Sequence, residues 1–160
     1  MAQEKLNNGM LPSNQKGVAD LLNTLLADAF TLYVKTLKFH WNVVGPNFSE
    51  LHSLFGEQYE ALQDAVDSIA ERVRQMGGTT EGTMEEFLKK ATIKEAPGEN
   101  PDAMGMIKEL LDGHEAVIRA LRVAIDKCFE EFKDQGTGNF LTDLMEKHEK
   151  TAWMLRSYTK

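Results

Sequence analysis

Apolar residues recur at every third or fourth position through most of this 160-residue chain, and this spacing constrains its fold more than any other feature. The first apolar set is Leu22, Leu25, Leu26, Ala29, Phe30, Tyr33, Leu37 and Trp41. The second set is Phe48, Leu51, Phe55, Leu62, Val66, Ile69, Val73 and Met76. Side chains with this spacing share one face of an α-helix, so both stretches predict long amphipathic helices.

Turn-forming residues divide the chain into elements. The breaks fall at Gly45-Pro46, Gly77-Gly78, the loop 92–99, and the pair Gly136 and Gly138. Four long helices are therefore expected: one from the cap region Leu11-Pro12-Ser13 to Gly45, one over Phe48–Met76, one over about 101–133, and one over about Asn139–Tyr158. The pattern Thr83-x-x-Glu86 is a capping box that predicts a short helix running to about Ala91. Asn100-Pro101 is the expected start of the third long helix.

The lengths of the connections predict how these helices are arranged. Short links join the first helix to the second and the third to the fourth, so each pair is expected to be antiparallel. A connection of more than twenty residues, which contains the short helix, separates the pairs. This describes an all-α, ferritin-like four-helix bundle with a short helix in the crossover. We expect residues 1–13 to form a mobile tail and residues 14–160 a single domain.

Composition excludes several classes of protein. The formal net charge of −7 argues against a dedicated nucleic-acid binder and suits cations better. Cys128 is the sole cysteine, which fits a reducing cytoplasm. We expect no membrane span and no secretory leader, because no run approaches about 20 apolar residues and the first ten residues lack an apolar core.

Two histidines and two carboxylates are candidate metal ligands. The Gly45-Pro46 turn should bring His40 and His52 close together, while Asp67 and Glu71 share a helix face at a spacing of four. However, about 28 Å of helix separates His52 from Glu71, at about 1.5 Å per residue. Either these are unrelated polar residues, or two subunits related by a two-fold axis complete the site. Nitrogen and oxygen donors of this kind suit iron or another first-row metal. No Glu-x-x-His occurs, so the bundle core itself is expected to be dry and apolar.

Two separated motifs give the chain a specific resemblance. The run His40-Trp41-Asn42-Val43-x-Gly45-x-x-Phe48-x-x-x-His52, followed by Asp67-x-x-Ala70-Glu71-Arg72, closely resembles the Dps family of mini-ferritins. The segment His148-Glu149-Lys150-Thr151-Ala152-Trp153-Met154-Leu155-Arg156 resembles the last helix of that family. The resemblance covers the chain from about residue 14.

This resemblance implies a function and an assembly. His40 and His52 would face Asp67 and Glu71 of a partner chain in a ferroxidase centre, with Trp41 beside it to intercept stray oxidising equivalents. Twelve subunits, built from two-fold dimers, would form a hollow cytoplasmic shell. The shell would oxidise Fe(II), preferentially with hydrogen peroxide, and store the ferric oxide. Zinc or manganese could bind the same donors.

The sequence departs from the family pattern at two places. Many members carry an acidic ligand one turn after the second histidine, where this chain has Gly56, so Glu57 is only an auxiliary candidate for a second iron position. Asp134 and Asp143 are the candidate residues of an acidic entry pore, although Asn139 stands where the family often has aspartate.

DNA binding is expected to be weak or absent. Family members that bind DNA strongly use a lysine-rich tail, whereas the first sixteen residues here hold two lysines and one glutamate. A nucleoid-binding structural protein with little ferroxidase activity is the alternative function, and it would associate with the nucleoid.

Overall fold

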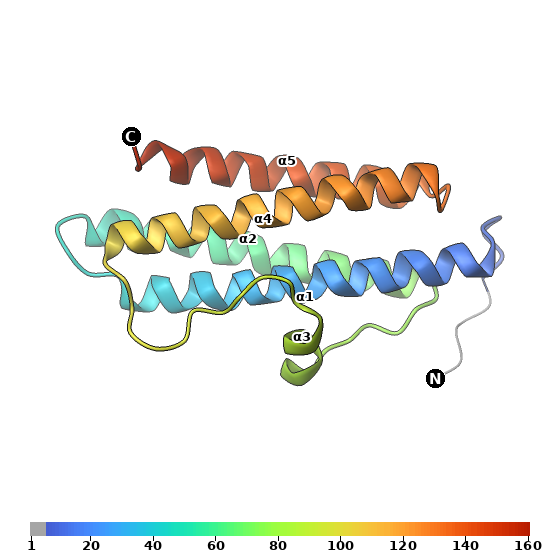
Figure 1. Cartoon of the computed structure of the whole chain (residues 1–160), viewed down its shortest axis with the longest axis horizontal. Helices are drawn as coiled ribbons and strands as arrows, with labels where there is room; N and C mark the ends of the chain where they lie inside the picture. Colours follow the sequence, from blue (N-terminus) through green and yellow to red (C-terminus); the bar gives the residue numbers. More distant parts are fainter. Residues whose placement is uncertain (1–5) are drawn as a thin grey trace.

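The computed structural model describes residues 6–160, which fold into five helices and contain no strand. The helices are α1 (Pro12–Asn42), α2 (Phe48–Gln75), α3 (Met84–Lys90), α4 (Ala103–Glu130) and α5 (Gln135–Ser157). The four long helices lie side by side, and α3 lies outside the bundle beside α1 (Figure 1). The expected four-helix bundle with a short helix in its crossover is confirmed.

The two apolar stripes form much of the core. Their buried members include Leu22, Leu26, Leu51, Phe55, Ile69 and Val73. Full burial of one such side chain stabilises the fold by about 1.5–3 kcal/mol. The helices pack mainly as the antiparallel pairs α1–α2 and α4–α5. Trp41, at the end of the first stripe, is an exception and is 67% exposed.

Two polar side chains of α1 hold the crossover against the bundle. Asp28 is buried, and its carboxylate accepts hydrogen bonds from Thr92 N (2.6 Å), Thr92 Oγ1 (2.8 Å) and Ile93 N (3.0 Å). Asn23 donates to the carbonyl of Thr79 at 3.0 Å and accepts from the backbone N–H of Glu81 at 3.0 Å. A buried carboxylate with three donors keeps its hydrogen bonding when it leaves water, so the long connection has one fixed path over α1.

The helix α3 begins as its sequence predicted. Thr83 accepts from the backbone N–H of Glu86, whose carboxylate accepts in return from the backbone N–H of Thr83 at 3.0 Å. This is the capping box read from the sequence. The ring of Phe87 then stacks on Phe30 of α1, with ring centroids 4.5 Å apart.

The expected start of the last helix was wrong by four residues. Helix α5 begins at Gln135, so Gly136 and Gly138 lie inside its first turns instead of breaking the chain. Asp134 is its N-cap and accepts from the backbone N–H of Thr137 at 3.0 Å. A Cβ at position 138 would lie 2.8 Å from the ring of Phe129, so Gly138 is required for the close approach of α5 to the end of α4.

Other boundaries also differ from expectation. The expected third long helix, 101–133, is shorter at both ends, because Asp102 rather than Asn100 caps it and it ends at Glu130. Helix α1 begins at Pro12, two residues before the expected domain start. Residues 1–5 of the expected tail lie outside the described residues, so the mobility of that tail stays a prediction.

Helix α1 is the one described helix that is long and apolar enough to cross a membrane by length and composition alone. However, 61% of its most apolar 18-residue stretch is buried inside the protein. That burial is typical of a helix packed in a protein core.

The expectation of a uniformly apolar bundle core was wrong where α4 packs against α5. His114 of α4 and His148 of α5 are buried, and their Nδ1 atoms lie 2.9 Å apart. Both histidines lie within apolar helix faces. Nδ1 of each ring is the hydrogen-bond partner of the other, between two neighbouring helices. The rule that predicted a dry core considered only Glu-x-x-His pairs and not a histidine from each of two helices.

Candidate metal centre

His40 and His52 bond each other's backbone across the turn between α1 and α2. Nδ1 of His40 lies 2.7 Å from the carbonyl oxygen of His52, and Nδ1 of His52 lies 2.9 Å from the carbonyl oxygen of His40. The rings stack with centroids 3.8 Å apart and planes 20° apart. A carbonyl can only accept, so Nδ1 carries the hydrogen in both rings. In the neutral ring Nε2 is then the atom with a free lone pair, which is the usual way in which a protein orients an imidazole ligand.

Aromatic neighbours hold the two rings in place. The ring of Phe48 stacks on His52 at 5.2 Å, and Tyr59 contacts His40 edge-on at 5.1 Å. The local sequence explains this arrangement, because Gly45 adopts φ +123° in the turn, a backbone conformation that L side chains rarely adopt. The turn therefore returns the chain at once, so that the start of α2 pairs with the end of α1.

Asp67 and Glu71 lie on α2, far from this histidine pair. Both are exposed and share one face of the helix. About 22 Å of helix separates His52 from Asp67, at about 1.5 Å per residue. Within residues 6–160, no three His, Cys, Asp or Glu side chains come close enough to hold one metal ion. The single chain thus brings together one half of the expected ligand set and leaves the other half on an open surface.

The remaining candidates near the histidines have different surroundings. Trp41 is 67% exposed and directly follows His40 in α1. Gly56 faces the histidines, since a Cβ there would lie 3.4 Å from Cε1 of His40. Glu57 instead borders a groove between α2 and α5. Its role as an auxiliary ligand stays a prediction, which this position does not favour.

The two pore candidates also differ from each other. Asp134 is only 6% exposed, caps α5 and pairs with Arg72, whose Nη2 lies 3.5 Å from its carboxylate. The carboxylate of Asp134 also accepts from the hydroxyl of Thr137. Asp143 is exposed. The helix cap explains the burial and hydrogen bonds of Asp134 without any pore. The pore role of Asp134 and Asp143 stays a prediction.

The groove beside α5 was not predicted from the sequence. Gln58, His114 and His148 line it and are all buried. The available signal was that His114 lies among Leu110, Val117 and Leu121 on the apolar face of α4. A lone histidine in such a face is usually a core residue, so the pairing became evident only with α4 and α5 packed together.

Comparisons with known proteins agree with this architecture. The family model described as a ferritin-like domain matches residues 19–160. An uncharacterized low temperature-induced protein of Nostoc sp. is 52% identical over 154 residues, which cover 96% of this chain and 86% of that protein. The DNA protection during starvation protein of Brevibacillus brevis is 38% identical over 149 residues, covering 93% of this chain and 99% of that protein.

A solved structure also shares this fold. The crystal structure of the DPS protein from Vibrio cholerae O1 is similar with a TM-score of 0.92 and 31% sequence identity, and it covers 100% of this chain and 99% of its own. That protein is described as a member of a broad superfamily of ferritin-like diiron-carboxylate proteins.

Proposed function

The chain belongs to the Dps family of ferritin-like proteins, and from this premise we propose that it oxidises Fe(II) at sites shared between two subunits and stores the ferric product. The observation that carries the proposal is the pair of hydrogen bonds between each of His40 and His52 and the backbone carbonyl of the other. It leaves two Nε2 lone pairs free at one end of the bundle, and within residues 6–160 no further His, Cys, Asp or Glu joins the two rings in a group that could hold a metal ion.

A second copy of the chain supplies what is missing. If two α2 helices pack antiparallel about a two-fold axis, the histidine end of one meets the acidic end of the other. Asp67 and Glu71 of the partner then complete a set of two imidazoles and two carboxylates. The symmetry makes two such sites in every dimer, and twelve subunits assembled from six dimers would close the shell.

Each residue type has a separate part in the chemistry. The imidazoles hold Fe(II), the substrate, and the carboxylates offset the additional charge of the Fe(III) product. Two Fe(II) ions give one electron each to one hydrogen peroxide, which takes up two protons and leaves as two waters. Trp41, exposed next to His40, would be oxidised in preference to other groups when an oxidising equivalent escapes from the site.

A nucleoid-binding structural protein is the second candidate function. Relatives named for DNA protection favour it, but the net charge of −7 opposes contact with phosphates. By removing Fe(II) and peroxide, the protein would protect DNA without binding to it. Iron oxidation is therefore the better supported function, and a cytoplasmic location stays a prediction.

Mixed assembly of two inactive variants tests the shared site. His52→Asn removes a ligand from one half of the site, and Asp67→Asn removes a ligand from the other half. In a mixed dimer one site loses both ligands and the other regains all of them. Half of all dimers are mixed in a random equal mixture, so about a quarter of the wild-type Fe(II) oxidation with peroxide should return.

A matched pair of variants controls this experiment. His40→Asn and His52→Asn alter the same half, so mixing them should restore nothing. If the His52→Asn and Asp67→Asn mixture also restores nothing, although labelled subunits demonstrably exchange, the shared site is wrong. Parallel titration with Zn²⁺ and Mn²⁺ would show whether either ion, rather than Fe(II), occupies the restored sites preferentially.

A further inference from the structure

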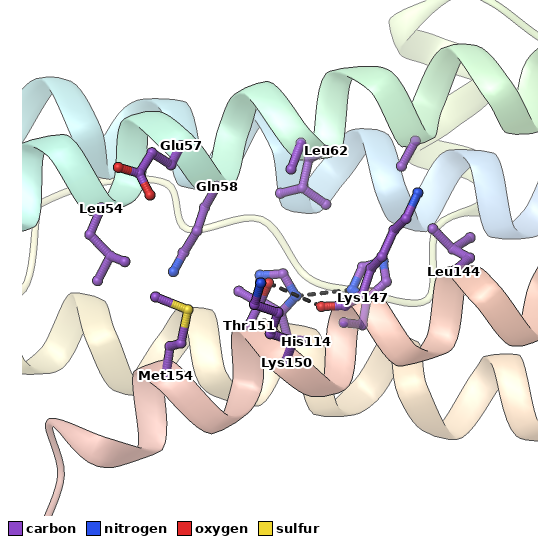
Figure 2. A pocket seen from close by; sticks show the side chains of 13 residues that line it. Leu54, Glu57, Gln58, Leu62, His114, Leu144, Lys147, Lys150, Thr151 and Met154 are labelled. Atoms are coloured by element: carbon purple, nitrogen blue, oxygen red, sulfur yellow. Dashed lines mark hydrogen bonds between the residues drawn. The ribbon is translucent and has the colours of Figure 1, made fainter.

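A groove of about 280 Å³ lies between α2 and α5, away from the histidines of the candidate metal centre. Its walls are largely apolar and include Leu54, Leu62, Leu144 and Met154. In Figure 2, Gln58 points from α2 towards α5, with Met154 opposite it. A cavity of about 150 Å³ is enough to hold benzene, so this groove has room for a single ring with substituents.

Three buried polar atoms at this groove have no partner among the described residues. They are Nε2 and Oε1 of Gln58 and Nε2 of His114. Gln58 is 6% exposed and His114 is 2% exposed, so neither side chain is freely solvated. An unpartnered buried amide is costly, and native proteins usually satisfy such groups with another molecule. The groove therefore has a polar floor that an occupant would complete.

The histidine pair is not arranged as a metal chelate. The two Nδ1 atoms are 2.9 Å apart while the ring centroids are 5.0 Å apart, so the two nitrogens point nearly at each other. Two imidazoles that share one ion point instead at a common third position. No cluster of three His, Cys, Asp or Glu occurs in residues 6–160 to complete such a site. The contact is therefore a hydrogen bond in which one ring donates and the other accepts.

Hydrogen-bond donors predominate around the groove. Burial lowers the pKa of both His114 and His148, so both rings are neutral near pH 7. The amide of Gln58 offers N–H donors and one acceptor at the floor. At the exposed mouth, the ammonium groups of Lys147 and Lys150 outnumber the single carboxylate of Glu57. A ligand that fits would carry a negative group at the mouth and a hydroxyl at the floor.

We propose that this groove binds a small aromatic carboxylate that bears a hydroxyl at its opposite end. The ring would lie between the apolar side chains of α2 and α5. The hydroxyl would donate to the amide oxygen of Gln58, or accept from its N–H, and the carboxylate would face Lys147 and Lys150. This site is separate from the proposed iron ligands His40, His52, Asp67 and Glu71, none of which lines the groove, and Gln58 and Lys147, on which the test depends, have no part in the candidate metal centre.

Calorimetric titration of the assembled protein with 4-hydroxybenzoate tests the proposal, with benzoate and 4-hydroxybenzyl alcohol as probes that each lack one polar end. The expected result is one 4-hydroxybenzoate per chain, bound more tightly than either probe. Gln58→Leu, which keeps the side-chain volume, should weaken 4-hydroxybenzoate about three- to tenfold and leave benzoate nearly unchanged. Lys147→Gln should weaken both carboxylates about two- to fivefold and spare the alcohol.

Two controls keep the result interpretable. Lys127→Gln changes an exposed lysine of α4 that does not line the groove, and it should alter no affinity. The thermal midpoint of Gln58→Leu without ligand should be no lower than that of the parent, because an unpartnered amide has been removed. Water as the only occupant would give no titration signal with any of the three compounds and would overturn the proposal. Binding that Gln58→Leu and Lys147→Gln leave unchanged would overturn it as well.

Discussion

His40 and His52 each direct Nδ1 at the other's carbonyl oxygen, at 2.7 and 2.9 Å. This relationship ties the end of α1 to the start of α2 and also sets the tautomer of both rings. The two hydrogen bonds thus stabilise the fold and also orient the ligand atoms. Substitutions that separate these two effects follow from it.

His52→Asn should separate folding from metal chemistry. The side-chain amide nitrogen of Asn lies near the position of Nδ1 and can still donate to the carbonyl of His40, but no atom replaces Nε2. We expect unfolding free energy within about 1 kcal/mol of the parent and Fe(II) oxidation about tenfold slower or worse. Thermal unfolding and stopped-flow oxidation measure the two quantities. Undiminished oxidation would remove His52 from the proposed centre.

Position 56 decides whether a second iron is held firmly. Gly56→Asp would place a carboxylate beside His40, since a Cβ there lies 3.4 Å from that ring. We expect more Fe(II) bound per site in anaerobic titrations. Gly56→Ala is the matched control: it should raise stability by up to about 1 kcal/mol through helix propensity without additional iron. Equal iron binding by the two variants would contradict a ligand role for this position.

Substitutions of Asp134 and Asp143 should have different effects on stability and on iron uptake if only one of the two residues serves iron entry. Asp134→Ala removes the N-cap of α5 and the carboxylate that pairs with Arg72, so we expect a loss of about 1–2 kcal/mol in unfolding free energy. Asp143→Asn should leave stability almost unchanged and slow iron uptake into the shell. Denaturant unfolding and uptake kinetics check this pair. Uptake at the normal rate in Asp143→Asn would exclude that residue from the pore.

The buried histidine pair should make stability sensitive to acid. Burial lowers the pKa of His148 from 6.5 to about 4 and lowers that of His114 as well. The unfolded chain therefore binds more protons than the native chain in this range, and stability decreases as the pH falls from 6.5 towards 4. His148→Gln should give a shallower decrease over the same window. Denaturant unfolding at several pH values would reveal it, and an unchanged slope would contradict the shift.

DNA should not be retained at physiological salt. A net charge of −7 per chain repels phosphate, and an assembled shell multiplies that charge. We expect no mobility shift of linear duplex DNA in about 150 mM salt. A complex that persists at this salt concentration would instead favour the nucleoid-binding alternative.

Sequence patterns predicted the fold well wherever the signal was local. The apolar stripe of α2, the capping box at Thr83 and the turn at Gly45 each depend on residues a few positions apart. The start of α5 was missed because Gly136 and Gly138 resemble helix breakers in isolation. Their actual role is to let α5 approach Arg72 and Phe129, which come from other parts of the chain.

The sequence by itself determined the ligand spacing: His52 and Glu71 lie too far apart on one helix for a single-chain site, because helical rise is fixed by backbone geometry. Only the tertiary structure decided that His40 and His52 brace each other through their carbonyls. It alone also placed His114 against His148 and left the side-chain amide of Gln58 without a partner among residues 6–160. Such contacts depend on which helix faces meet and how closely, and no local pattern in the chain encodes that.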